Sequence, residues 1–296
     1  IEEFNFVTPT PSEHVWLYEG ATEWMADVSQ VRGGVIDPET YLARLTDKLQ
    51  ANDGYDPEWS ISEMSLKSYS DKGQRDWGNI YQRGAIVAGL LDLEILFRSG
   101  GQRGLREVVL ELAAKYGPDT AFAEAEFFDE FAAMTYAEIR PFFERYIRGT
   151  EPLPIEEFFA RVGVEYLPEL RTGEMQPSFG VQAGVLGDRL QFVGVGDVAA
   201  ACGLAAGDVL LAIDDLDVTL ANAQQAYLEL HGLGAGEPFV MRVVRGDEEL
   251  AFTCEKQLVE VVEAHVLQFD PDATPKQLAL RDPWLRNLPV NQAQRH

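Results

Sequence analysis

The sequence has few basic residues and a large excess of acidic ones. Among its 296 residues, 24 are Lys or Arg and 49 are Asp or Glu, which gives a formal net charge of -25 at pH 7. Such a surface repels phosphate groups, so nucleic acids and anionic membranes are disfavoured as partners. The simplest interpretation of this charge is solubility, because net charge bears on solubility and association rather than on fold.

Cysteine is also scarce, since the chain contains only Cys202 and Cys254. Their spacing fits neither a metal-binding motif nor a disulfide framework, so two buried free thiols are the default expectation. The two side chains could pair only if the fold brings them together.

Long apolar runs are missing as well. No stretch approaches the ~20 apolar residues that a membrane-spanning helix needs, and no signal peptide opens the chain. The first residue is Ile1 rather than Met, so we expect the true N-terminus to be missing. The compartment is therefore left open between the bacterial cytoplasm and the periplasm.

The sequence divides into two regions with different patterns, and the first region is helical. Apolar residues recur at helical spacing over 17–31, and Asp37 and Pro38 then suit the N-cap and first position of a second helix. Residues 85–97 are apolar nearly all round, which predicts a buried helix. We therefore expect a helical region over 1–163.

Beyond this region glycine becomes frequent and the apolar runs shorten. A helix is predicted over 220–230, and strands over 190–195, 209–213, 239–244 and 250–254. The fold class is therefore multi-domain α + β. We expect a linker over 164–176, a small β-rich domain over 177–264 and a C-terminal tail of unknown function over 265–296.

The most specific stretch is A-C-G-L-A-A-G-D-V-L-L-A-I-D at 201–214. It resembles the A-G-L-x-x-G-D-x-I-L-x-I-D-G signature of PDZ domains from proteases, with Cys202 at the usual Ala. In PDZ domains, backbone N–H groups of a loop bind a peptide carboxylate, and the following strand accepts the peptide as an added strand. The resemblance implies that Phe179, Gly180 and Val181 form this loop. An occluded, purely structural groove is the alternative, and the sequence leaves both open.

A second specific stretch is W-L-Y-E-G-A-T-E at 16–23. It resembles the helix start at which gluzincin-type zinc peptidases present a glutamate ligand, after an H-E-x-x-H helix with two His ligands and a general-base Glu. The resemblance implies that Glu19 is a zinc ligand and that Glu23, on the same helical face, hydrogen-bonds a ligating His. It also implies that Trp16 and Tyr18 keep water from the site. Without the resemblance, two glutamates at this spacing would predict a solvated face.

Further along, I-Y-Q-R-G at 80–84 resembles the Tyr-x-Lys-Gly element of the same peptidases, with Arg83 at the position of the Lys. In that element the Tyr hydroxyl donates a hydrogen bond to the oxyanion of the tetrahedral intermediate. The resemblance therefore gives Tyr81 a catalytic role, whereas a lone tyrosine is more often a core residue.

Taken in order, these elements resemble the glycyl aminopeptidase family of PDZ-bearing zinc metallopeptidases. The family implies zinc as cofactor, a thermolysin-like catalytic domain whose helical C-terminal part is residues 1–163, and a PDZ domain after it. It also implies hydrolysis of peptide substrates, often after a small N-terminal residue such as Gly or Ala.

The sequence departs from this family in its histidines. None of His14, His231, His265 and His296 forms H-E-x-x-H. His14 precedes Glu19 at a spacing that shares a helical face poorly, so we interpret it as a helix-start or surface residue. We expect the C-terminal portion of a zinc aminopeptidase that is inactive alone, because the two His and the base lie in a missing upstream segment. The alternative is a non-catalytic PDZ protein that binds peptides on a degenerate peptidase scaffold, and a purely structural scaffold is the weakest reading.

Overall fold

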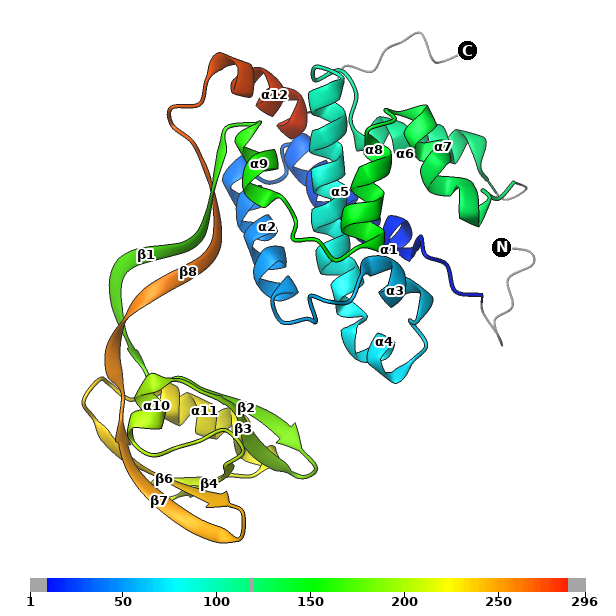
Figure 1. The fold of residues 1–296 in the computed structure, drawn as a ribbon. Helices are drawn as coiled ribbons and strands as arrows, with labels where there is room; N and C mark the ends of the chain where they lie inside the picture. Colours follow the sequence, from blue (N-terminus) through cyan, green and yellow to red (C-terminus); the bar gives the residue numbers. More distant parts are fainter. Residues whose placement is uncertain (1–9, 118–119, 287–296) are drawn as a thin grey trace. The chain divides into compact units, whose positions relative to one another are not determined.

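The computed structural model describes residues 10–117 and 120–286, which form two compact units (Figure 1). The first unit holds the described residues up to 170 and from 264 onward, and the second holds residues 171–263. The chain passes from one unit to the other along strands β1 (Val164–Ser178) and β8 (Gln257–Phe269), which pair as a two-stranded ribbon. The predicted multi-domain α + β class is confirmed.

The first unit is helical, and we call it the helical unit. Its α-helices are α1 (Val15–Arg32), α2 (Pro38–Asn52), α3 (Ile61–Leu66), α4 (Asp71–Asp76), α5 (Gly78–Arg98), α6 (Leu105–Lys115), α7 (Phe127–Met134), α8 (Ile139–Phe143), α9 (Ile155–Ala160) and α12 (Pro275–Leu285). Two short helical turns, η1 (Glu124–Glu126) and η2 (Glu144–Arg148), lie before α7 and after α8.

Helix α5 forms the centre of this unit. Its residues from Arg83 to Leu96 are all buried, which confirms the buried helix predicted over 85–97. Helices α1 and α2 pack along it. The start of α2 is also as predicted, because the Asp37 side chain accepts a hydrogen bond from the Thr40 N–H at 2.7 Å, with Pro38 at the first helical position.

The second unit, which we call the β-rich unit, is an antiparallel sheet with two helices. The strands are β2 (Val181–Leu186), β3 (Arg189–Val195), β4 (Val209–Ile213), β5 (Leu216–Asp217), β6 (Pro238–Arg245) and β7 (Glu248–Glu255). They pair in the order β2-β3-β4-β6-β7, with β5 on β4, so β2 is an edge strand. Ala199 of α10 (Asp197–Ala201) and Ala226 of α11 (Ala223–Gly232) contribute to its core.

Cys202 and Cys254 form a disulfide, so the default expectation of free thiols is wrong. Cys202 caps the C-terminus of α10, and β7 brings Cys254 opposite it, with the two Cα atoms 5.4 Å apart. That separation lies within the range that a disulfide spans. The pairing depends on a contact across 52 positions of sequence, which neither cysteine's neighbours encode.

The segments expected as linker and tail both have regular structure. Residues 164–176, the expected linker, lie within strand β1, which crosses from the helical unit into the second unit. Part of the tail forms α12, whose Trp284 ring lies 5.7 Å from the Tyr41 ring of α2. The Nε of Arg32 donates to the Trp284 carbonyl at 2.9 Å, which ties α12 to α1. Among the described residues, no helix is both long and apolar enough to cross a membrane.

Candidate functional site

The contact between α1 and α5 rests on two glycines. A Cβ atom added to Gly20 would lie 2.5 Å from the Cα of Gly84, a distance that real side chains do not tolerate. The two helix backbones therefore touch at this point. Gly20 directly follows Glu19, and Gly84 lies one helical turn after Tyr81. The close approach brings these two predicted site residues together, although they are far apart in sequence.

The Glu19 carboxylate and the Tyr81 hydroxyl interact across this contact. Burial raises the pKa of Tyr81 above its usual value, and a hydrogen bond with Glu19 raises it further. Both effects favour the protonated phenol, because an anion would be poorly solvated there and would face a carboxylate. The Trp77 ring packs edge-on against the Tyr81 ring, with centroids 6.4 Å apart. The Tyr81 hydroxyl therefore stays protonated and can donate a hydrogen bond.

Glu19 differs from the other acidic residues of α1 and its approach, because each of those has a cationic partner. Glu13 pairs with Arg148 at 2.6 Å, Glu23 with Lys48 at 2.6 Å, and Asp27 with Arg44 at 2.8 Å. Across the described ranges 10–117 and 120–286, no ion pair involves Glu19. Its carboxylate is therefore available to a cation from elsewhere.

Of the other residues expected around Glu19, Glu23 pairs with a lysine, Trp16 is buried and Tyr18 is exposed. Glu23 is engaged by Lys48, and no histidine lies in a described contact with it. Trp16 has no exposed surface and packs against Phe143, so it supports α1 from within the core and cannot shield a solvent-facing site. Tyr18 is 75% exposed, so it does little to keep water from the site. The role of Glu23 beside a ligating His stays a prediction.

His14 occupies the N-cap position of α1, as expected, but it is not a surface residue. It is only 3% exposed, and its ring packs against Phe122, Phe127 and Phe128. Its Nε2 lies 2.9 Å from the Glu124 carbonyl oxygen. Local sequence patterns do not indicate this burial, because the three phenylalanines lie more than 100 residues away.

The remaining histidines lie outside this site. His231 stacks on Tyr227 in α11, and His265 in β8 lies between the Tyr166 hydroxyl and the Asp53 carboxylate. His296 is outside the described residues. No group of three metal-ligating side chains forms among residues 10–117 and 120–286. The described residues therefore supply one candidate ligand and do not complete a zinc site.

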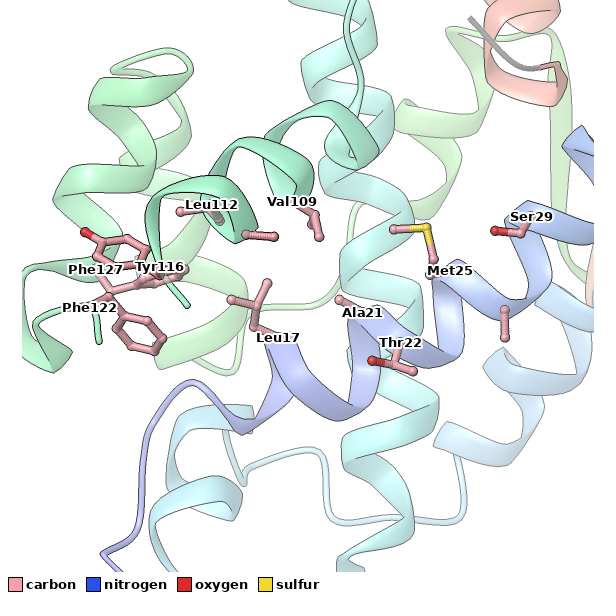
Figure 2. A pocket seen from close by; sticks show the side chains of 12 residues that line it. Leu17, Ala21, Thr22, Met25, Ser29, Val109, Leu112, Tyr116, Phe122 and Phe127 are labelled. Atoms are coloured by element: carbon pink, nitrogen blue, oxygen red, sulfur yellow. The ribbon is translucent and has the colours of Figure 1, made fainter. Parts of the chain in front are cut away.

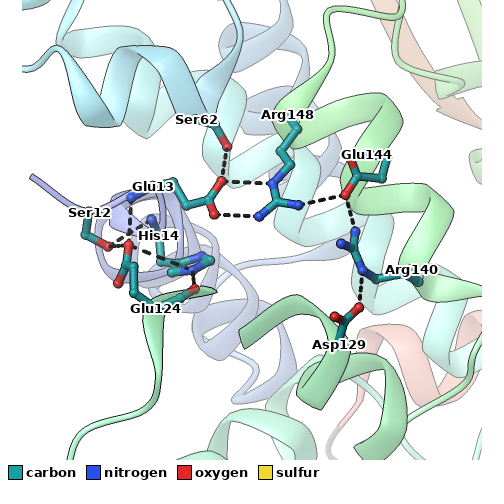
Figure 3. Close-up of polar contacts among 9 residues, drawn as sticks. All are labelled: Ser12, Glu13, His14, Ser62, Glu124, Asp129, Arg140, Glu144 and Arg148. Carbon is teal, nitrogen blue, oxygen red and sulfur yellow. Dashed lines mark hydrogen bonds and ion pairs between the residues drawn. The ribbon is translucent and has the colours of Figure 1, made fainter. Parts of the chain in front are cut away.

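A chain of alternating charges anchors the start of α1 (Figure 3). Arg148 donates two hydrogen bonds to Glu13, at 2.6 and 2.9 Å, and these hold the pKa of Glu13 below its usual value. Arg148 also contacts Glu144, which in turn pairs with Arg140. Sequence inspection missed this network, because Glu13 and Arg148 are 135 positions apart.

The loop expected to bind a peptide carboxylate leads into β2. Phe179 is buried, with its ring 4.9 Å from the Phe239 ring, so its side chain belongs to the core rather than to a groove. Gly180 has φ +79°, and its carbonyl accepts a hydrogen bond from the Gly196 N–H at 2.6 Å. Val181 then begins β2, which pairs with β3 on one side alone among the described strands. The outer edge of β2 is therefore open to strand addition.

An open groove lies along α1 on the side toward α6 (Figure 2). Its volume is about 610 Å³, and apolar side chains make up most of its lining. Leu17, Ala21 and Met25 line it from α1, and Val109 and Leu112 line it from α6. We call this cavity the α1–α6 groove.

Comparison with known proteins supports the family resemblance. Residues 1–87 match the M61 glycyl aminopeptidase family. An aminopeptidase N family protein from Idiomarina loihiensis has a similar structure, with a TM-score of 0.67 and 22% sequence identity. That match covers 96% of this chain and 50% of the other, so the chain spans about half the length of that structure. No curated protein matches the chain.

Two further structures match smaller shares of the chain, at low TM-scores. The match to the HtrA-type protease AlgW with a tripeptide covers 29% of this chain and 32% of that chain. Its TM-score is 0.25 and its sequence identity is 22%. The match to the HtrA3 PDZ domain bound to a phage-derived ligand covers 29% of this chain and 90% of that domain. Its TM-score is 0.24 and its sequence identity is 17%. The predicted resemblance to the M61 glycyl aminopeptidase family is confirmed over residues 1–87, and the structural match shows a shared fold.

Proposed function

We propose that this chain is the C-terminal portion of a zinc-dependent aminopeptidase, in which Glu19 is one metal ligand and Tyr81 is a hydrogen-bond donor to the substrate. The observation that supports this most directly is the backbone contact of Gly20 with Gly84, which brings together the helices that carry Glu19 and Tyr81. The family resemblance singles out Glu19 and Tyr81 separately, and the close contact between α1 and α5 supports a shared site.

The chemistry of Glu19 suits a zinc ligand, because a carboxylate oxygen without a described cationic partner can bind the ion. The described residues offer no further ligands at this point, so two histidines and a general base would come from the rest of the full-length protein. When bound, zinc would polarise the scissile carbonyl and lower the pKa of a bound water.

Tyr81 acts on the substrate in this proposal. Its hydroxyl donates a hydrogen bond to the carbonyl oxygen on which negative charge develops, and loss of one such donor costs about 10²–10³ in kcat. The Gly20–Gly84 contact sets the separation of α1 and α5, the helices that carry Glu19 and Tyr81. A shift of this contact would misplace the donor relative to the metal ligand.

The test uses the full-length protein and aminopeptidase substrates that begin with Gly or Ala. Glu19→Gln is expected to lose bound zinc and activity, whereas Tyr81→Phe is expected to keep zinc and lose about 10²–10³ in kcat. Tyr18→Phe is the matched control, since this exposed tyrosine lies on the same helix, and it should leave kcat unchanged. Full zinc content and activity in Glu19→Gln would refute the assignment.

The second candidate function is non-catalytic peptide binding by the β-rich unit. It is favoured by the open edge of β2 and by the left-handed glycine that precedes it. A peptide with a free C-terminus should then bind more tightly than its amidated form, and equal affinities would argue against carboxylate capture. An in-frame H-E-x-x-H in the full-length sequence would favour the enzyme, and its absence would favour the binder.

A further inference from the structure

Helix α10 connects two features of the β-rich unit. It begins after Gly196, whose N–H donates a hydrogen bond to the Gly180 carbonyl at 2.6 Å. It ends before Cys202, which forms the disulfide with Cys254 of β7. Strands β2 and β7 lie at opposite ends of the strand order. One end of this short helix therefore contacts the loop that leads into β2, and the other end is covalently bonded to the strand farthest from it.

The contact between Gly180 and Gly196 is close. A Cβ atom added to Gly196 would lie 3.2 Å from the Gly180 carbonyl oxygen, and one added to Gly180 would lie 3.6 Å from the Gly196 Cα. The two backbones are therefore in van der Waals contact as well as hydrogen-bonded. Because Gly196 holds the Gly180 carbonyl, a displacement of α10 would also displace Gly180 and the backbone N–H groups beside it.

Helix α10 has few anchors of its own. Ala199 is the one fully buried residue among its five, and a helix this short is not stable in isolation. The next anchors lie beyond Cys202, where Leu204 is buried and the Gly203 carbonyl accepts a hydrogen bond from Arg245 at 2.7 Å. The disulfide at Cys202 is therefore the strongest restraint on the end of α10 itself.

The two sulfurs of this disulfide differ in exposure. Cys254 is only 2% exposed, whereas Cys202 is partly buried. Thiol–disulfide exchange begins when a thiolate attacks an accessible sulfur, so a small dithiol would react at Cys202. The dithiol loses two electrons and two protons and becomes a cyclic disulfide. Cys202 and Cys254 gain them and become two thiols.

We propose that the Cys202–Cys254 disulfide is a redox control on the loop at Gly180. In the oxidised protein, α10 is held at both ends and keeps the N–H groups beside Gly180 in position to bind a peptide carboxylate. In the reduced protein, α10 is released at its Cys202 end, and the loop binds the carboxylate less tightly. The proposal rests on the second candidate function, peptide binding by the β-rich unit.

Fluorescence anisotropy with the full-length protein tests this proposal. The probes are a labelled decapeptide that ends in valine with a free carboxylate, and the same decapeptide with an amidated C-terminus. Each is titrated before treatment with dithiothreitol, after it, and again after reoxidation. Reduction is expected to weaken binding of the free-acid peptide by at least about fivefold, the lower end of typical coupling between linked sites. Binding of the amidated peptide should not change, and reoxidation should restore the difference.

Two variants separate the redox effect from general destabilisation. The double variant Cys202→Ala, Cys254→Ala cannot form the bond, so it should bind both peptides as the reduced protein does and should not respond to dithiothreitol. The matched control is Val243→Ala, which removes buried methyl groups from β6, outside α10 and the Gly180 loop. It should keep both the preference for the free-acid peptide and the response to dithiothreitol.

Three results would overturn the proposal. An equal preference for the free-acid peptide in the oxidised and reduced protein would remove the redox control and leave carboxylate capture intact. Equal affinities for the two peptides in both states would refute carboxylate capture itself, and the redox control with it. A loss of preference in Val243→Ala as large as that in the double variant would assign the effect to general destabilisation.

Discussion

Each residue that decides the candidate site acts through a partner distant in sequence. Gly20 is the clearest case, because its backbone contact with Gly84 sets the separation of α1 and α5. Glu19 and Tyr81 could not interact if either glycine carried a larger side chain and the helices moved apart.

Gly20→Ala is expected to destabilise the helical unit by about 1–3 kcal/mol, because the added methyl group would overlap the α5 backbone. The measurement is urea unfolding followed by tryptophan fluorescence. Gly89→Ala is the control on α5, since its Cβ would meet Trp24 at an ordinary 3.5 Å, and alanine favours a helix by roughly 0.5–1 kcal/mol over glycine. Equal stability losses in the two variants would contradict the close-contact argument.

The Glu13–Arg148 pair makes a separate prediction at the residue scale. Arg148→Met should destabilise the helical unit by about 1.5–3 kcal/mol at pH 7, because the partly buried Glu13 loses both hydrogen bonds from Arg148. Arg145→Met is the control, since Arg145 and Glu151 are both about half exposed, and it should change stability by less than about 0.5 kcal/mol.

The pH dependence of this pair has a defined sign. The folded pKa of Glu13 is lowered from 4.5, so its contribution is present above that value and is lost as pH falls through the lowered pKa. Wild-type protein should therefore lose more stability below pH 4.5 than Arg148→Met does. Parallel pH profiles for the two proteins would argue against this role for the pair.

Among the elements, the buried helix α5 and the edge strand β2 play opposite roles. Helix α5 is apolar nearly all round and packs against α1, α2 and α9, so it fixes the frame that carries Tyr81. Strand β2 has one unpaired edge among the described strands, and the Gly180 loop precedes it. Helix α5 thus gives the candidate site a rigid support, and β2 offers backbone N–H and C=O groups to an added strand.

The disulfide between α10 and β7 should stabilise the β-rich unit. Cys254→Ser is expected to lower its stability by about 2–4 kcal/mol, in line with typical disulfides. Hydrogen exchange of backbone amides in residues 171–263 measures this effect, and tryptophan fluorescence serves as the control because all five tryptophans lie in the helical unit. Reaction of both cysteines with an alkylating agent in the native, unreduced protein would show that the bond is not formed.

At the scale of the whole molecule, the chain consists of two units. One carries a candidate metal ligand, and the other has an open sheet edge. Each has its own apolar core, and the paired strands β1 and β8 connect them. The chain also spans half the length of a similar structure. Zinc binding and catalysis are therefore expected of the full-length protein rather than of these 296 residues.

This expectation can be measured as a shift in thermal stability. A ligand present at a hundredfold excess over its Kd stabilises the folded state by about 2.7 kcal/mol. Zinc should therefore raise the Tm of the full-length protein, and it should leave the fluorescence-detected Tm of the 296-residue chain unchanged. Stoichiometric zinc and peptidase activity in the 296-residue chain would contradict the proposed division of the site.

The sequence by itself determined the features that local patterns encode. Helical periodicity and the apolar run of α5 predicted the helical unit, and short apolar runs with frequent glycine predicted the β-rich one. The Glu-Gly and Tyr-x-Arg-Gly stretches singled out Glu19 and Tyr81 by resemblance. These inferences need only residues close together in the chain.

Only the tertiary structure decided which distant side chains meet. It brought Glu19 to Tyr81, gave Glu23 a lysine partner, buried His14 among phenylalanines and joined Cys202 to Cys254. The physical reason is that helix packing and sheet pairing are set by many weak contacts over the whole core. A local sequence window contains none of the partner residues that such contacts select.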